Sequence, residues 1–282
     1  MASATIKLFL PYGDAKRLRI GEVSNWTGKA LAAPRTEIDD LLRREEAESA
    51  GVYFLFGSDP ESGDRMAYIG EAEVIRDRLK QHKAKDFWNT VVVFISKDEN
   101  LTKAHIRYLE NRLLHEAKQA GRYRLENSNT SNPKLPESDR EDMEVFLSRI
   151  KQVLPVLGSD LLTPVSGSIK TANPQKELFC RNKGAVARGR RTESGFVVFK
   201  DSTAVVAERA SAEAQHPYVV ALRKKLVQDG TLVEKDGFFV FTKDTEFASP
   251  SAAAAVIHGG GANGLTAWKD ANGKSLKEIE EG

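Results

Sequence analysis

A glutamate on the apolar side of an expected helix is the residue with the clearest capacity for chemistry. Residues 101–119 are expected to form a long amphipathic helix. Its apolar positions recur at helical spacing, and they are Ile106, Leu109, Leu113, Leu114 and Ala117. Glu110 falls inside this stripe, where an ionised carboxylate is costly unless it is paired, hydrogen-bonded or bound to a cation. The pattern therefore predicts either an ion pair with an arginine or a cation-binding carboxylate.

The helix expected before it, over residues 73–82, carries a cation and an imidazole on one face. Arg78 and His82 are four residues apart, so their side chains project side by side. This pair suits contact with a phosphate, because guanidinium groups bind phosphate oxygens with strong charge-assisted hydrogen bonds. The alternative is an arginine that extends its head to solvent beside a half-buried histidine.

Two tyrosines belong to an expected β-hairpin. The strand tripeptides Gly51-Val52-Tyr53 and Tyr68-Ile69-Gly70 flank a turn-rich segment at residues 57–64. Gly51 and Gly70 are expected to be structural and to leave room at the strand ends.

In this order and on these elements, the residues resemble the GIY-YIG nuclease family. The matching positions are Tyr53, Tyr68, Arg78, His82, Glu110 and Asn127, with Asn129 as the rival for the family asparagine. Two departures are the valine at position 52 in place of isoleucine and a longer segment between the tyrosines, which we attribute to an expanded turn.

The resemblance implies an endonuclease that hydrolyses phosphodiester bonds with one divalent metal. Glu110 is then the only protein carboxylate on a Mg²⁺ or Mn²⁺ ion. Tyr53 orients or deprotonates the attacking water, and Tyr68 assists it. Arg78 stabilises the charge that develops on the phosphate, and His82 contacts the phosphate or moves a proton.

These residues require an α+β fold of two domains. Residues 1–50 are expected to be an N-terminal α/β extension, with strands at 6–10 and 18–23 and a charged helix at 37–48. The nuclease domain is expected over residues 51–156, with a small mixed or antiparallel sheet flanked by helices. Residues 157–175 read as a linker, and residues 176–282 as a smaller α+β domain.

The C-terminal half resembles the domain of unknown function that often follows a GIY-YIG module in bacterial proteins, and its end also resembles the restriction-associated RAMA module. Its expected elements are a strand at 195–199, a helix at 217–228, a hairpin over 231–241 and a helix at 249–258. A basic cluster without acids consists of Arg181, Lys183, Arg188, Arg190 and Arg191. This cluster, together with Trp268, predicts DNA contact, and the alternative is a solvated basic loop.

Composition limits the function classes. The chain has 40% hydrophobic and 29% charged residues, a net charge of +2 and one cysteine, Cys180, so no internal disulfide can form. No apolar run reaches membrane-spanning length, and a cytoplasmic location is expected. We expect an endonuclease acting on DNA in defence, restriction or repair. The alternatives are a non-cleaving nucleic-acid-binding protein and an RNA-directed nuclease, and a dimer is compatible with each.

Overall fold

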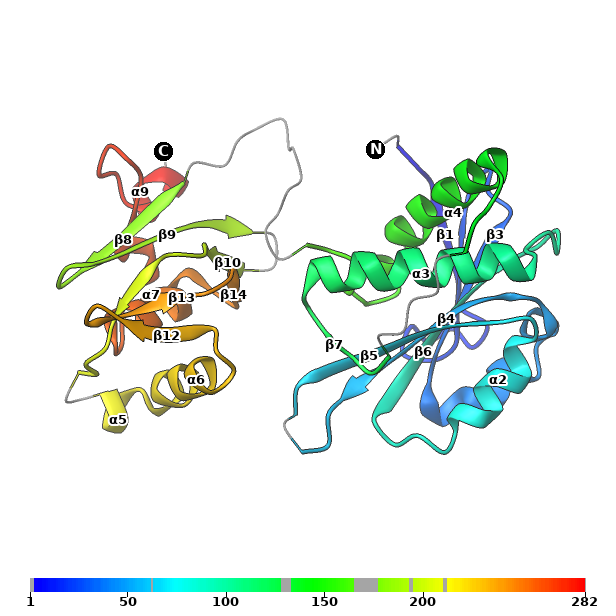
Figure 1. The fold of residues 1–282 in the computed structure, drawn as a ribbon, viewed down its shortest axis with the longest axis horizontal. Helices are drawn as coiled ribbons and strands as arrows, with labels where there is room; N and C mark the ends of the chain where they lie inside the picture. The colour runs from blue at the N-terminus through cyan, green and yellow to red at the C-terminus, as the bar shows by residue number, and fades with distance from the viewer. Residues whose placement is uncertain are drawn as a thin grey trace. The chain divides into compact units, whose positions relative to one another are not determined.

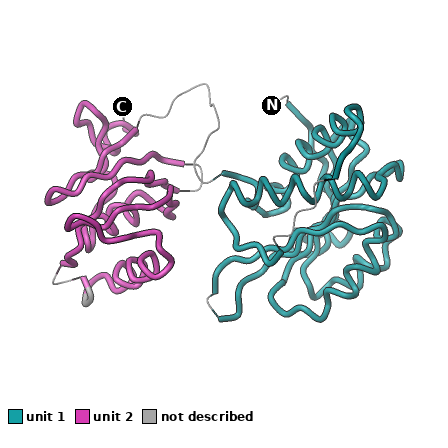
Figure 2. Tube along the Cα trace, viewed as in Figure 1, with its two compact units in different colours: residues 1–164 teal, residues 165–282 magenta. Residues whose placement is uncertain are grey.

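The chain forms two compact units, Met1–Pro164 and Val165–Gly282 (Figure 2). The computed structural model describes residues 3–61, 63–127, 133–164, 177–192, 195–209 and 212–281. Each unit combines helices with antiparallel strands, which confirms the expected α+β class. The division between the units falls within the expected linker at 157–175, of which residues 165–175 lie outside the described part.

A seven-stranded sheet is the framework of unit 1 (Figure 1). Its strands are β1 (Ile6–Phe9), β2 (Arg19–Val23), β3 (Gly28–Pro34), β4 (Gly51–Ser58), β5 (Arg65–Ala72), β6 (Trp88–Ser96) and β7 (Arg124–Leu125). Their spatial order is β1-β2-β3-β6-β4-β5-β7. The β5–β7 pair is parallel and the other pairs are antiparallel, so the sheet is mixed.

The first 50 residues do not form a separate compact unit, because β1, β2 and β3 continue the same sheet as the expected nuclease core. Strand β3 was not expected from the sequence. It is rich in alanine, which has low strand propensity. Ala30, Ala32 and Ala33 are fully buried between β2 and β6, so tertiary packing decides their conformation.

Helices cover both faces of this sheet. One face packs against α3 (Lys103–Ala120) and α4 (Glu137–Val156). The other face packs against α1 (Ile38–Leu42) and α2 (Ile75–His82). The α3 helix begins at a capping box formed by Thr102 and His105 and ends at Gly121, which adopts the left-handed conformation typical of helix ends.

The helix expected over residues 37–48 is interrupted. The structure contains the 3₁₀ turn η1 (Arg35–Glu37), then α1, then a second 3₁₀ turn, η2 (Glu45–Glu48). The break falls at Arg44, whose backbone is extended and whose guanidinium donates to Glu46. Local side-chain pairing therefore ends the helix.

Unit 2 is built on a five-stranded antiparallel sheet in the order β14-β10-β9-β8-β15, beside a three-stranded sheet in the order β11-β13-β12. The strands are β8 (Leu178–Asn182), β9 (Ala185–Thr192), β10 (Gly195–Val198), β11 (Thr203–Val205), β12 (Leu232–Lys235), β13 (Phe238–Phe241), β14 (Thr245–Phe247) and β15 (Trp268–Lys269). The helices are α5 (Ala212–Gln215), α6 (Pro217–Gln228), α7 (Pro250–His258), α8 (Gly264–Ala267) and α9 (Leu276–Glu281).

The core of unit 2 lies between the five-stranded sheet and α7. The alanine-rich helix α7 begins at Ser249, whose hydroxyl accepts a hydrogen bond from the Ala252 amide, and ends at the left-handed Gly259. Phe196 and Trp268 meet beneath it, with ring centroids 4.3 Å apart. Among the described helices of both units, none combines the length and apolarity needed to cross a membrane.

Candidate active site

The β4–β5 hairpin places both predicted tyrosines on one face of the sheet. In the register of this pair, Tyr53 lies opposite Gly70 and Leu55 lies opposite Tyr68. Because side chains alternate between faces along a strand, these four residues share a face. Residues 59–64 form the expanded connection between the strands. The Tyr53 and Tyr68 rings stack with centroids 6.0 Å apart.

Glycine is required at position 70 because the Tyr53 ring lies directly over its backbone. A Cβ atom there would overlap the Tyr53 hydroxyl and come within 2.8 Å of the Tyr68 ring. Gly51 is similarly crowded, since a Cβ atom would collide with the carbonyl of Phe94. Both glycines of the tripeptides therefore permit close packing, as expected.

His82, at the end of α2, contacts both tyrosines. Its Nε2 lies 2.8 Å from the Tyr53 hydroxyl, and its ring centroid is 4.8 Å from that of Tyr68. The imidazole is buried, and its Nδ1 has no hydrogen-bond partner in the described part of the chain. Burial, with the nearby charges of Lys85 and Arg78, lowers the pKa of His82 to about 4. The histidine is therefore neutral at physiological pH.

Arg78 is coupled electrostatically to both halves of the predicted site. Burial raises the pKa of Tyr53 well above its ordinary value. Arg78 opposes this rise through its hydrogen bond with Tyr53 and through its positive charge. Hydrogen bonding to Tyr53 in turn raises the pKa of Arg78. The positive charge of Arg78 also partly offsets the rise that burial causes in the pKa of Glu110. Tyr53 is thus a neutral phenol in this environment, close to a cation.

Glu110 lies on α3, on the side of the sheet opposite the tyrosines. Its side chain is half-buried, and its carboxylate makes no hydrogen bond or ion pair with any described residue. Burial, followed by the negative charge of Glu71, raises the pKa of Glu110 to about 7. Within the described ranges, Glu110 does not form the ion pair with arginine that was the alternative expected from the sequence. The carboxylate is available to a ligand.

Glu71 and Arg107 border Glu110 and were not expected from the sequence. Glu71 follows Gly70 on β5, and its carboxylate lies 3.7 Å from Nε of Arg107 on α3. Strand alternation could have indicated that Glu71 faces away from Tyr68. That it comes close to Glu110 depends on how α3 lies over β5, which no local pattern specifies.

The chemistry of Glu110 fits a hard divalent cation. Mg²⁺ and Mn²⁺ prefer oxygen donors, and Mg²⁺ commonly takes one or two carboxylates and fills its shell with water and phosphate oxygens. In the described ranges, no three His, Cys, Asp or Glu side chains come together as a metal-binding group. The described residues therefore supply fewer than three such ligands, and water or phosphate oxygens would have to complete the shell.

Lys85 and Glu126 form a second unexpected pair beside the tyrosines. The Lys85 ammonium donates to Glu126 Oε1 at 2.6 Å and lies 4.7 Å from the Tyr68 ring centroid. Arg35 holds this loop by donating to the backbone carbonyl of Lys85 at 2.5 Å. The Lys85 ammonium therefore joins the Arg78 guanidinium and the His82 imidazole near Tyr68.

Asn127 has a structural contact that the sequence did not indicate. Its Oδ1 accepts from the Ile69 amide at 3.2 Å and its Nδ2 donates to the Ile69 carbonyl at 2.6 Å. The side chain therefore continues the β5–β7 pairing by one residue and holds the Tyr68-Ile69-Gly70 segment. Asn129, the rival position, lies outside the described residues.

The basic cluster of unit 2 is a β-hairpin and not a loop. Strands β8 and β9 are joined by Lys183 and Gly184, both with positive φ, as in a type I′ turn. The structure separates the five cations. Arg188 and Arg190 share one face of β9, whereas Arg191 alternates to the other and pairs with Glu280 at 2.9 Å. Arg181 lies on β8, and Lys183 is exposed at the turn.

Trp268 cannot contact DNA in this structure. It is fully buried in the core of unit 2, and its indole nitrogen donates to the Pro250 carbonyl at 3.0 Å. Its expected role as a reader residue is therefore wrong, and it is a core residue.

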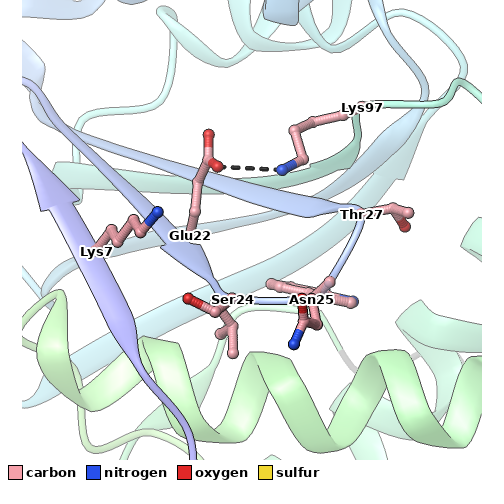
Figure 3. Close-up of a pocket in the computed structure, with 8 residues that line it drawn as sticks. Lys7, Glu22, Ser24, Asn25, Thr27 and Lys97 are labelled. Atoms are coloured by element: carbon pink, nitrogen blue, oxygen red, sulfur yellow. Dashed lines mark hydrogen bonds and ion pairs between the residues drawn. The ribbon is translucent and has the colours of Figure 1, made fainter.

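A shallow polar pocket in unit 1 lies beside the β2–β3 turn (Figure 3). Its charged lining includes Lys7, Glu22 and Lys97, and Lys97 donates to Glu22 at 3.1 Å. None of the predicted catalytic residues lines it.

Comparison with known proteins supports one of the resemblances. Residues 178–280 match the family model of a domain of unknown function (DUF4357). No curated protein and no solved structure matches the chain. The expected relationship of the C-terminal half is therefore confirmed at the level of this domain, which carries no assigned activity.

Proposed function

We propose that this protein is a metal-dependent endonuclease that cleaves phosphodiester bonds of DNA by a one-metal mechanism of the GIY-YIG type. The observation that carries the proposal is the half-buried carboxylate of Glu110, which has no partner among the described residues and is electrostatically coupled to Arg78. A carboxylate kept in this state is costly to a structural protein and useful to a metal site.

The residues with proposed catalytic roles lie on two sides of β5. Glu110 would hold a Mg²⁺ or Mn²⁺ ion, which supplies Lewis-acid polarisation of the phosphate and lowers the pKa of a bound water. Arg78 would bind a non-bridging phosphate oxygen and stabilise the negative charge of the transition state. Lys85, whose ammonium lies over the Tyr68 ring, would add a further charge-assisted contact to the phosphate.

Tyr53 is better suited to orient the attacking water than to remove its proton. Its raised pKa opposes formation of a phenolate, and Arg78 only partly offsets the effect of burial. The contacts with His82 and Gly70 fix the ring, so the hydroxyl is held in one place. Positioning of this kind reduces the entropic part of the barrier.

Nicking of supercoiled plasmid tests the proposal. The full chain should nick plasmid DNA with Mg²⁺ or Mn²⁺ and not with excess chelator. Glu110→Gln should reduce the rate by at least about a hundredfold, because it removes the metal ligand and leaves the fold intact. Nicking that survives in Glu110→Gln, or in chelator, would overturn the mechanism.

Glu116→Gln is the matched control. Glu116 lies on the same helix, is half-buried and pairs with Lys151 at 2.6 Å and Arg112 at 3.6 Å. This substitution removes a paired carboxylate, so it should cost some stability without changing the nicking rate per folded molecule. An equal loss of nicking in both variants would indicate damage to α3 and not loss of a ligand.

The substrate is defined by a parallel cleavage panel of plain, methylated, branched and single-stranded DNA and RNA. Cleavage of RNA in preference to every DNA would replace DNA as the substrate and keep the mechanism. Binding without cleavage of any member would instead identify a nucleic-acid-binding protein. That outcome would leave the half-buried, unpaired carboxylate of Glu110 without a chemical role.

A further inference from the structure

The five-stranded sheet of unit 2 has one face covered by α7 and an opposite face that is exposed along β8, β9 and β15. Leu178, Cys180, Ala187, Phe196 and Trp268 belong to the buried core under α7. The alternate residues of the same strands therefore point to the opposite face, which we call the outer face. In β8, β9 and β15 these residues are Phe179, Arg181, Val186, Arg188, Arg190 and Lys269.

The strand register arranges cations and aromatic rings alternately across the outer face. Lys269 lies opposite Phe179, and Phe179 lies opposite Arg188. On the other side of β9, the Phe199 amide donates to the Arg188 carbonyl at 2.9 Å, which continues the row. One line across the sheet thus reads lysine, phenylalanine, arginine, phenylalanine.

Two further arginines lie over these rings. The guanidinium carbon of Arg181 is 5.9 Å from the Phe179 ring centroid, and that of Arg190 is 5.7 Å from the Phe199 ring centroid. Arg181, Arg188 and Lys269 are exposed, while both rings are partly exposed. Among the described residues, the acidic groups on or next to the strands of this face are Glu177, which pairs with Arg188 at 3.4 Å, and Glu246 on β14. The described cations of this face are Arg181, Arg188, Arg190 and Lys269, so they outnumber these two acids.

We propose that the outer face of this sheet binds a single-stranded nucleic acid, with phosphates on the arginines and Lys269 and bases against Phe179 and Phe199. A duplex keeps the faces of its bases stacked in its interior and exposes only phosphates, sugars and base edges, so it offers no base face to rings placed between cations. An unpaired strand offers both groups at once, and base stacking on aromatic side chains tolerates any sequence. The proposal does not depend on cleavage by unit 1.

Binding by the full chain carrying Glu110→Gln, in chelator, tests this surface without cleavage. Fluorescence anisotropy is measured with a labelled mixed-sequence DNA strand, its duplex, and an RNA strand of the same sequence. Phe179→Ala and Arg188→Ala should each weaken binding of the single strand about tenfold and change duplex binding by less than about twofold. The RNA arm shows which sugar the surface accepts.

Arg191→Ala is the matched control because Arg191 lies on the same strand and faces away from this surface. It should change single-strand affinity by less than about twofold. Phe179→Leu keeps an apolar side chain and removes the ring, so it should weaken binding as Phe179→Ala does, while thermal unfolding confirms that the domain is folded.

Three results would overturn the proposal. One is an equal effect of Arg191→Ala and Arg188→Ala, which would indicate a diffuse charge effect. Another is an equal loss of duplex and single-strand affinity, which would identify a duplex phosphate surface. The third is unchanged affinity in folded Phe179→Leu, which would remove the stacking contact.

Discussion

The Tyr53 hydroxyl and Nε2 of His82 are 2.8 Å apart in the interior of unit 1, while Nδ1 of the same ring has no partner in the described residues. This arrangement favours one tautomer. An orphaned N–H donor is rarer in protein interiors than an under-used acceptor, so the proton belongs on Nε2. His82 then donates to the Tyr53 oxygen, which leaves the Tyr53 proton for another acceptor.

The buried, neutral His82 should make stability depend on pH. Its pKa of about 4 in the folded protein lies below the ordinary value of 6.5, so the unfolded chain binds more protons between these values. Stability that is complete above pH 6.5 should fall by up to about 3 kcal/mol as the pH drops toward 4. His82→Gln, which does not titrate, should flatten this part of the curve in urea unfolding. If the wild-type dependence of stability on pH persists in His82→Gln, other titrating groups cause it.

Glu110 should destabilise the metal-free protein at neutral and alkaline pH. Its folded-state pKa of about 7 lies above the ordinary 4.5, so the folded protein retains a proton that the unfolded chain has already released. Stability should therefore decrease as the pH rises from 4.5 to 7. At pH 8, without metal, Glu110→Gln should be more stable than wild type by about 1–3 kcal/mol.

Thermal unfolding with and without millimolar MgCl₂ checks this prediction about Glu110. The metal should raise the wild-type melting temperature and leave that of Glu110→Gln unchanged, because only the wild type binds it. At pH 4, where the glutamate is protonated in both states, the two proteins should have similar stability. If Glu110→Gln is less stable than wild type at pH 8, burial of the ionised Glu110 carboxylate does not destabilise the metal-free protein.

Lys85 should contribute to substrate binding. Its ammonium lies over Tyr68 and is held by Glu126, within reach of a phosphate bound between Arg78 and His82. Lys85→Met removes one charge-assisted phosphate contact, so KM should rise about tenfold with a smaller change in kcat. The control is Lys83→Met in the same loop, since Lys83 pairs with Asp39 away from the tyrosines. Equal changes in KM in both variants would show that the loss of net positive charge, and not a contact of Lys85, causes the effect.

The sequence predicted the parts of the site that depend on local periodicity. Strand alternation and helical spacing were sufficient to place Tyr53 with Tyr68, and Arg78 one turn before His82. The contributions of Glu71 and Lys85 depend on how α3 crosses β5 and on the path of the chain after α2. Those are tertiary features, and no spacing in the sequence encodes them.

The fold class was likewise predictable, while several elements were not, and β3 and β9 show why. The alanines of β3 carry no strand signal, and only burial between β2 and β6 makes them a strand. In β9, Gly189 and the arginines around it resemble a loop. A period of two was nevertheless present there, and it separates Arg188 and Arg190 from Arg191. Applied to the basic cluster, that period would have predicted that its arginines lie on two different faces of a strand.

Asn127 should act by holding β5 and not by touching the substrate. Both atoms of its amide bond the backbone of Ile69, between Tyr68 and Gly70, so its hydrogen-bonding capacity toward a ligand is largely used. Asn127→Ala should lower stability by about 1–3 kcal/mol, since two hydrogen bonds are lost at a half-buried strand. At a temperature where the variant is fully folded, it should keep nicking activity within about tenfold of wild type. Asn89→Ala is the control, because exposed Asn89 accepts one hydrogen bond from Thr90 and should affect neither property. A loss of nicking in folded Asn127→Ala as complete as in Glu110→Gln would place Asn127 among the catalytic residues.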